Sequence, residues 1–318
     1  MRSIMDRFHF LAYRYNYTRA PRLNHKKPID VSLELASECN QRCSYCYHAD
    51  KVPFTKGMME WKVAQLIIAQ AADLEVPSIK MNWKGESTLN PEFARITRLA
   101  KDHATRTTFI ERLTNSNFKF GSTREDIFEG LSHQTKVKVS FDSFIPGVME
   151  KQRAGSNPAL AEKNITTFYN RPKRETEIVI QAVITKLNEN EDIEGEVKKR
   201  WPSATVSIRN MVAGRVENKF VEEVENKKRD TENRQSCIQA HARLVFNWDG
   251  IAFPCCVDIS ESMPLGDIKK VDLDKIFRGE KAKDLRAALL DKSAFSCGTC
   301  QKCSSFESYG GYKAPWLS

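Results

Sequence analysis

Three cysteines stand close together early in the chain, within the sequence CNQRCSYC. They are Cys39, Cys43 and Cys46, and their spacing is C-x3-C-x2-C. Thiolates are soft ligands that suit zinc or iron–sulfur clusters. Structural zinc normally takes four ligands, often as two separated pairs, so three thiols on one loop fit it badly. A four-iron cluster held by three cysteines keeps one iron open, and the spacing therefore favours a cluster that binds a cofactor or substrate at its free position.

The segments around this loop predict alternating strands and helices from Pro28 onward. Pro91 suits the first turn of the second helix. Strands are expected over 29–37, 78–83, 107–115, 136–143, 176–185 and 204–212, and helices over 58–74, 90–104, 123–134, 157–172 and 190–201. Such alternation implies a parallel sheet with right-handed crossovers, either an open doubly wound sheet or a barrel or partial barrel. In both architectures functional residues lie at the carboxyl ends of strands, where the cysteine loop follows the first strand.

Composition limits the class of protein. The 318 residues are 41% hydrophobic, which is enough for one large domain or a large and a small one. No apolar run is long enough for a membrane span or a signal-peptide core, so we expect a cytoplasmic protein. The nine cysteines fall into two groups, 39–46 and 237–303, as expected for metal or redox chemistry and not for a disulfide scaffold.

Net charge is concentrated at the N-terminus. The chain carries +9, and residues 1–27 hold seven basic side chains and one acid, so this arm alone carries +6 and leaves about +3 for the rest. A nucleic-acid surface spread over the whole protein is therefore not expected. The aromatic, basic arm is interpreted as a first helix covering the open edge of the barrel. The alternative is contact with an acidic partner, nucleic acid or a membrane surface.

The cysteine loop resembles the cluster-binding motif of the radical S-adenosylmethionine (radical SAM) enzymes, CxxxCxxC with an aromatic residue, here Tyr45, before the last cysteine. NWKGESTLNPEF resembles the family's GGEP segment, in which Gly85 and Glu86 match while Lys84 and Ser87 depart. The resemblance implies a partial (β/α)6 barrel and a three-cysteine 4Fe-4S cluster with S-adenosylmethionine. By the same resemblance, the residues expected to bind the cofactor are Tyr45, Gly85, Glu86, Asn115, Ser140, Asp142 and Arg153.

The second cysteine group resembles the auxiliary iron–sulfur domains of this family, the SPASM domain and its shortened "twitch" form. Beyond a charged linker, the sequence predicts a hairpin turning at Asp249-Gly250, then one or two short helices and CGTCQKC. Six cysteines are too few for two fully ligated clusters, so one auxiliary 4Fe-4S cluster is expected. Its predicted ligands are Cys237, Cys255, Cys297 and Cys300, with Cys303 the alternate for one of the last pair. Cys256 is interpreted as a small buried hydrophobic residue, and structural zinc on the same thiols is the alternative.

Together these observations predict an α/β protein with four parts. They are an arm at 1–27, a radical SAM partial barrel at 28–216, a linker at 217–236, and a small hairpin-and-helix iron–sulfur domain with a tail at 237–318. The expected function is reductive cleavage of S-adenosylmethionine and hydrogen abstraction from a small molecule, a carbohydrate or a peptide side chain. An electron donor such as flavodoxin or ferredoxin is expected. The alternatives are an iron–sulfur electron carrier or redox sensor, and a zinc-bearing nucleic-acid binder.

Overall fold

The computed structural model describes residues 4–49, 52–104, 109–115, 117, 124–210, 237–296, 299–300 and 303. The linker predicted at 217–236, the tail beyond 303, and Cys297 lie outside these residues. Within the described part no helix is both long and apolar enough to cross a membrane.

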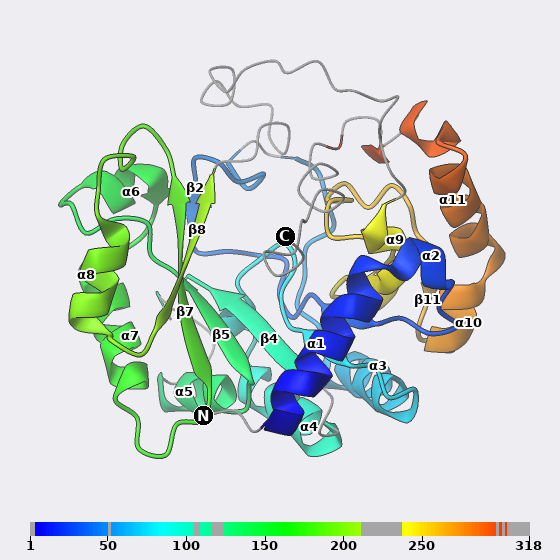
Figure 1. Cartoon of the computed structure of the whole chain (residues 1–318), viewed down its shortest axis with the longest axis horizontal. Coiled ribbons are helices and arrows are strands. Elements are labelled where there is room, and N and C mark those ends of the chain that lie inside the picture. The colour runs from blue at the N-terminus through cyan, green and yellow to red at the C-terminus, as the bar shows by residue number, and fades with distance from the viewer. Residues whose placement is uncertain are drawn as a thin grey trace.

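A nine-stranded sheet forms the centre of the described molecule (Figure 1). Its spatial order is β11-β10-β9-β1-β3-β4-β5-β7-β8. The six strands from β1 to β8 are parallel, as the alternating sequence pattern predicts. Their bounds are β1 Asp30–Leu33, β3 Ser78–Lys80, β4 Phe109–Thr114, β5 Lys136–Ser140, β7 Glu177–Ile184 and β8 Thr205–Asn210. This mostly parallel sheet confirms the expected α/β partial-barrel class.

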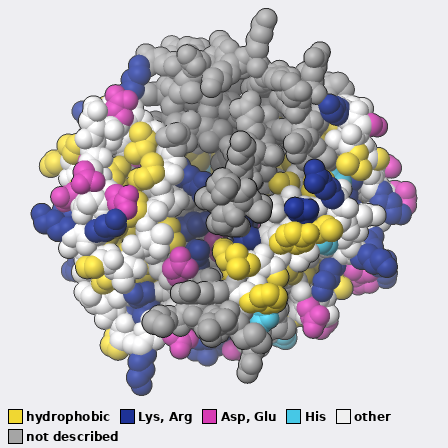
Figure 2. Space-filling view, viewed as in Figure 1, with side chains coloured by type: hydrophobic (Ala, Val, Ile, Leu, Met, Phe, Trp, Pro, Cys, Tyr) yellow, Lys and Arg dark blue, Asp and Glu magenta, His cyan; other side chains and the backbone are white. Residues whose placement is uncertain are grey.

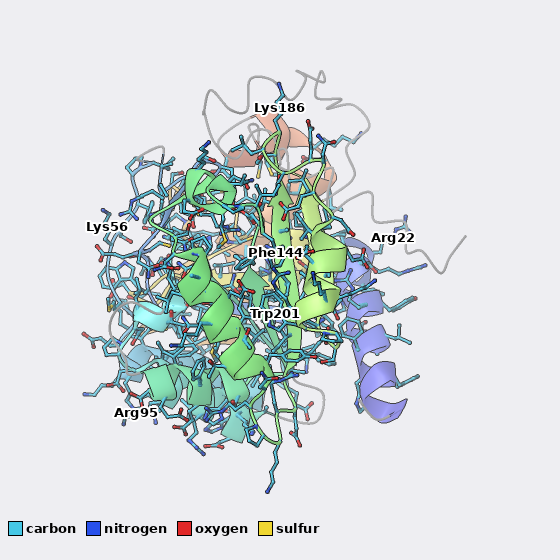
Figure 3. The ribbon with its side chains drawn as sticks, turned by 90° about the vertical axis from the view of Figure 1, so that its left-hand side faces the viewer. Arg22, Lys56, Arg95, Phe144, Lys186 and Trp201 are labelled. Carbon is cyan, nitrogen blue, oxygen red and sulfur yellow. The ribbon has the colours of Figure 1, made fainter. Side chains whose placement is uncertain are left out.

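Helices cross over between these strands and cover the outer face of the sheet. They are α3 Trp61–Asp73, α4 Phe93–His103, α5 Arg124–Ser132, α7 Pro158–Tyr169 and α8 Ile193–Arg200. Phe144 and Trp201 lie between the outer helices and the sheet, with ring centroids 6.2 Å apart (Figure 3). The expected place of Pro91 in the first turn of α4 is wrong. The helix begins only at Phe93, because Asn90 holds the preceding turn through its bond to the Glu92 N–H.

Short elements connect the strand ends at the carboxyl edge of the sheet. The two-residue strands β2, Arg42–Cys43, and β6, Arg153–Ala154, pair antiparallel. The helix α6, Val148–Gln152, leads into β6, and the 3₁₀ turn η1, Ser87–Leu89, follows β3.

The C-terminal region extends the same sheet. β9, Arg243–Phe246, pairs parallel with β1, and β10, Ile251–Phe253, turns back antiparallel on β9. The predicted hairpin turn is present, and Gly250 adopts a φ of +86°, which glycine tolerates best. β11, Gly266–Asp267, adds an outer strand. The remaining elements are α9 Ile238–Ala242, α10 Leu273–Arg278, α11 Glu280–Leu290 and η2 Ser293–Ser296.

The two faces of the sheet differ in chemistry because side chains alternate along each strand. Val31, Ile79 and Val137 are buried in the apolar core beneath the helices. The alternate positions carry buried or half-buried charges that pair across strands. These pairs are Lys80 with Asp30 at 2.6 Å, Arg243 with Asp30 at 2.8 Å, Lys138 with Glu111 at 2.8 Å, and Lys136 with Glu177 at 3.2 Å. The inner face is therefore polar.

The N-terminal arm is helical. α1, Ile4–Thr18, is followed by the short helix α2, Ala20–Leu23. Tyr13 and Tyr17 are buried against Ile29 and Phe109, and the Tyr13 hydroxyl donates to Asp30 at 3.4 Å. α1 therefore packs where the strands begin, on the side of the inner charges, and not along an open edge. Hydrophobic and basic side chains are exposed together where α1 crosses the molecule (Figure 2).

Candidate functional site

The cysteine loop follows β1 at the carboxyl edge of the sheet. Cys43 lies in β2 opposite Arg153 of β6, so the small ladder fixes these two residues side by side. The Cys46 N–H donates to the Cys43 carbonyl at 2.9 Å. The Arg42 guanidinium donates to the Cys39 carbonyl at 2.6 Å. These bonds bend the chain so that all three thiols belong to one compact loop.

Two N–H groups from other elements point at the thiols. Nη1 of Arg153 lies 3.7 Å from the Sγ of Cys43, and Nδ2 of Asn115 lies 3.6 Å from the Sγ of Cys39. Burial raises the pKa of Cys39 to about 12, and Glu86 adds to the effect. Burial also raises the pKa of Cys43, although Arg153 opposes the change. Buried thiols of this kind lose their protons when a metal centre takes the sulfur.

Asp142 connects the cysteine loop to the strand ends. Arg153 binds both of its oxygens, at 2.7 and 2.8 Å, and the Tyr45 hydroxyl donates to it at 2.6 Å. The Val183 N–H also donates to it at 3.0 Å. Asp142 is fully buried. Burial raises the pKa of Tyr45 well above its usual value, so this hydroxyl remains a donor.

No side chain fits at Gly85, because neighbouring backbone atoms occupy the space that a Cβ would take. A Cβ there would lie 2.3 Å from the Glu38 carbonyl oxygen and 2.4 Å from that of Ala36. The next N–H, that of Glu86, donates to the same Glu38 carbonyl at 2.8 Å. The loop after β3 therefore lies directly against the backbone that leads into the cysteine loop.

The Glu86 carboxylate is used to join two strand ends. It accepts hydrogen bonds from both the N–H and the hydroxyl of Thr88, from the Thr114 hydroxyl, and from the Asn115 N–H at 2.8 Å. Asn115 in turn donates to Asn40 at 2.7 Å. Ser140 is buried at the end of β5. The structure thus brings together at one edge the seven residues expected to bind the cofactor.

The second cysteine group lies beyond the linker. Cys237 precedes α9, Cys255 and Cys256 follow β10, and the Cys303 N–H donates to the Cys300 carbonyl at 3.3 Å. Burial raises the pKa of Cys237 to about 11, with Cys303 and Cys256 close enough to contribute. The interpretation of Cys256 as a buried hydrophobic residue is wrong. Cys256 is half-buried, and an Arg243 N–H points at its sulfur from 3.4 Å.

Residues 237–304 match the SPASM family, described as an iron–sulfur cluster-binding domain. No match is found among curated proteins. The similar solved structures include three at 16% identity each. One is BtrN in complex with AdoMet and 2-DOIA, with a TM-score of 0.57 over 86% of this chain and 92% of that chain. Another is Streptococcus suis SuiB bound to precursor peptide SuiA, at 0.63 over 94% and 74%. The third is anSMEcpe with bound AdoMet, at 0.63 over 89% and 85%.

The chain shares the fold of these structures, and its C-terminal segment matches the SPASM iron–sulfur family. The fold and the SPASM-type segment expected from the sequence resemblance are thereby confirmed.

The donor set suits the groups that the sequence resemblance implies. The first loop offers three sulfurs, and an arginine and an asparagine direct N–H groups at two of them, as is common around iron–sulfur clusters. Within the described ranges, no three Cys, His, Asp or Glu side chains converge as they would around a single ion. The ligand roles of Cys39, Cys43 and Cys46 and of the second group remain predictions.

Sequence reasoning missed several residues that build this edge. Asn117 donates to the Gly155 carbonyl at 3.0 Å, and Asn188 donates to the Asp142 carbonyl at 2.7 Å. The Gln41 amide oxygen lies 3.7 Å from the Cys43 thiol. Their only sequence signal is a polar side chain near the end of a strand. Lys84 carried a clearer signal, because it replaces a glycine of the motif.

Proposed function

We propose that this chain is a radical SAM enzyme that holds a 4Fe-4S cluster on Cys39, Cys43 and Cys46. The observation that carries the proposal is the closed set of contacts from Cys43 to Arg153, Asp142 and Tyr45, at the carboxyl edge of the sheet. If the thiols only filled an apolar core, a buried arginine–aspartate pair beside them would be costly and would add nothing to the packing. When bound, the cluster and S-adenosylmethionine supply a 5'-deoxyadenosyl radical that can remove a hydrogen atom from a substrate.

The protein's own residues would hold and shield these groups. Arg153 places positive charge beside the Cys43 sulfur, which favours its thiolate form. Asp142 fixes the orientation of Arg153 through two hydrogen bonds. Tyr45, held by Asp142, keeps an aromatic ring within the cysteine loop. Gly85, Glu86, Asn115 and Ser140 complete the proposed S-adenosylmethionine site at the ends of neighbouring strands.

We further propose one auxiliary 4Fe-4S cluster in the C-terminal segment. Cys237, Cys255, Cys297 and Cys300 are the proposed ligands, with Cys303 the alternate for one of the last pair. A cluster fully ligated by cysteine cannot chelate a substrate. It would instead accept the electron released when a substrate radical is oxidised, or carry electrons to the first cluster. The proposed external electron donor is a flavodoxin or ferredoxin.

The proposed substrate is a small molecule, a carbohydrate or a peptide side chain. The similar structures include both kinds of bound molecule, 2-DOIA in BtrN and the peptide SuiA in SuiB.

Two matched variants test the function. After anaerobic reconstitution, dithionite and S-adenosylmethionine are added and 5'-deoxyadenosine is measured. We expect its formation by the wild type, its loss in a Cys39/Cys43/Cys46→Ala triple variant, and its retention in a Cys237/Cys255→Ala variant. Bound iron without any 5'-deoxyadenosine would favour an electron carrier or redox sensor. Tight zinc with salt-dependent nucleic-acid binding would favour the zinc-bearing alternative.

A further inference from the structure

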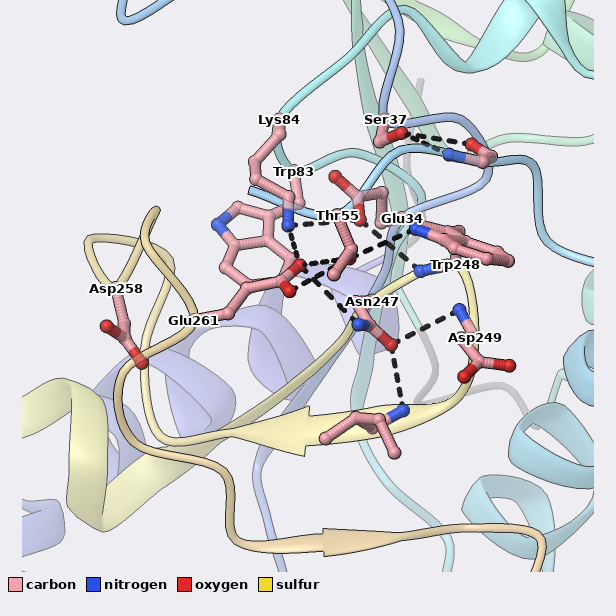
Figure 4. A network of polar contacts seen from close by, with 12 residues as sticks. Glu34, Ser37, Thr55, Trp83, Lys84, Asn247, Trp248, Asp249, Asp258 and Glu261 are labelled. Atoms are coloured by element: carbon pink, nitrogen blue, oxygen red, sulfur yellow. Dashed lines mark hydrogen bonds and ion pairs between the residues drawn. The ribbon is translucent and has the colours of Figure 1, made fainter. Parts of the chain in front are cut away.

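Lys84 occupies the position where the GGEP-like segment departs from glycine, and its side chain is completely buried. It forms ion pairs with two carboxylates, Glu34 just beyond β1 and Glu261 of the C-terminal region (Figure 4). Its ammonium group also lies 4.0 Å from the Trp83 ring centroid and 5.1 Å from that of Phe54. A buried ammonium group is costly unless it is paired, so this arrangement has to form as a unit.

The backbone of Lys84 contacts the cysteine loop. Its carbonyl accepts hydrogen bonds from the Tyr47 hydroxyl and, at 3.0 Å, from the His48 ring. Both residues directly follow Cys46. One residue therefore joins the cysteine loop, the end of β1 and the C-terminal region.

Glu261 is held in place for this contact. Its φ is +58°, in the left-handed region that non-glycine residues seldom adopt. The Thr55 hydroxyl lies 2.9 and 2.8 Å from its two carboxylate oxygens. The turn that carries it is fixed by Asp258, a buried residue that accepts hydrogen bonds from Ser262 at 2.6 Å and from Thr299 at 3.0 Å. Thr299 is the neighbour of Cys300, so the turn is tied to the second cysteine group.

Glu34 makes a poorer partner than Glu261. Its Oε2 lies 3.4 Å from the Lys84 ammonium and accepts a bond from the Trp248 N–H at 3.3 Å, while its Oε1 has no hydrogen-bond partner among the described residues. One cation thus faces two carboxylates, and the closer one belongs to the C-terminal region.

We propose that Lys84 is a positioning residue that ties the loop carrying Gly85 and Glu86 to the C-terminal region through Glu261. The inference rests on the proposed function, since that loop is part of the proposed S-adenosylmethionine site. The cofactor site is then fully formed only when the C-terminal region is bound to Lys84 through Glu261. A glycine at this position could not make the connection.

Hydrogen–deuterium exchange on the anaerobically reconstituted protein tests the proposal without relying on turnover. The variants are Lys84→Met, Glu261→Gln and Lys84→Arg, and Lys269→Met is the matched control because it breaks an exposed pair with Asp249. We expect the exchange rate of peptides covering 84–89 to rise about tenfold or more in Lys84→Met and in Glu261→Gln. In Lys84→Arg, which keeps the positive charge, the rate should stay close to that of the wild type, and in the control it should be unchanged. Unchanged exchange in these peptides, or an equal rise across the whole chain, would overturn the proposal.

Affinity for S-adenosylmethionine provides the second readout. We expect the Kd to rise about 5- to 150-fold in Lys84→Met, and the Lys84→Met/Glu261→Gln double variant to be no worse than the single variants. Equal binding by the wild type and Lys84→Met would overturn the positioning role. Failure of the wild type to bind the cofactor would instead overturn the proposed function, so the two failures are distinguishable.

Discussion

At the residue scale, Asp142 fixes the positions of several groups in the candidate site. It accepts hydrogen bonds from Arg153, Tyr45 and the Val183 N–H while fully buried. Removing one partner of a buried ion pair leaves an uncompensated charge, and this usually costs more than the pair contributes as a whole.

Arg153→Met should therefore destabilise the protein by about 3–5 kcal/mol. Chemical denaturation gives the change in the free energy of unfolding. Arg171→Met is the control, because Arg171 pairs with the exposed Glu125 and such a pair contributes about 0–1 kcal/mol. Similar decreases in the free energy of unfolding in the two variants would show that the buried Arg153–Asp142 pair contributes no more to stability than the exposed Arg171–Glu125 pair.

Glu34 predicts a pH-dependent stability. Burial raises its pKa to about 7, and Lys84 and the Trp248 N–H offset only part of this effect. The native state therefore keeps Glu34 protonated at pH values above about 4.3, where the carboxyl of the unfolded chain has already ionised. The contribution of Glu34 to the free energy of unfolding is therefore fully present at low pH and is lost as the pH rises through about 7. Glu34→Gln should remove this loss and gain on the order of 2 kcal/mol relative to wild type between pH 5 and pH 8. Parallel stability curves for the two proteins over that range would contradict the assignment.

Spacing and strand order made much of this site predictable. Three close cysteines after a first strand and polar residues after later strands must meet at one edge of a parallel sheet. The Lys84–Glu261 pair was not predictable, because its partners are 177 positions apart and belong to different regions. Cys256 was misassigned because strand alternation was applied beyond the end of β10, where the chain has already turned.

At the element scale, α1 has one face that packs and one that does not. Tyr13 and Tyr17 are buried against the strand starts, whereas Phe8, Leu11 and Tyr15 are exposed. The sequence predicted a covering helix but placed it at an open edge. Its position depends on the inner charges, since Tyr17 lies against Lys80 and Arg243, and no local pattern reveals them.

Tyr17→Ala should cost about 3–5 kcal/mol, because a large buried ring is lost. Tyr15 lies in the same helix and is 54% exposed, so Tyr15→Ala should change stability by no more than about 0.5 kcal/mol. Thermal denaturation of both variants measures the difference. Equal effects would mean that α1 is not packed through Tyr17.

At the scale of the whole molecule, the C-terminal region and the barrel share one sheet. β9 lies beside β1 over four residue pairs, from Asp30 with Arg243 to Leu33 with Phe246. Sequence analysis separated these parts because the hairpin follows a long charged linker. It could not show that the hairpin returns to the first strand, since pairing over more than 200 positions leaves no local signal.

A shared sheet predicts one cooperative unfolding transition. Circular dichroism and tryptophan fluorescence should report the same midpoint in denaturant, because neither part can open without exposing the edge of β1. Two separate transitions would show that the C-terminal region folds independently of the barrel.

Electron paramagnetic resonance tests the central claim most directly. The protein is reconstituted anaerobically with iron and sulfide in a Cys237/Cys255→Ala background, reduced, and measured with and without S-adenosylmethionine. We predict that the spectrum of the reduced cluster on Cys39, Cys43 and Cys46 changes when the cofactor is added. An intact reduced cluster whose spectrum is identical in both samples would contradict the account.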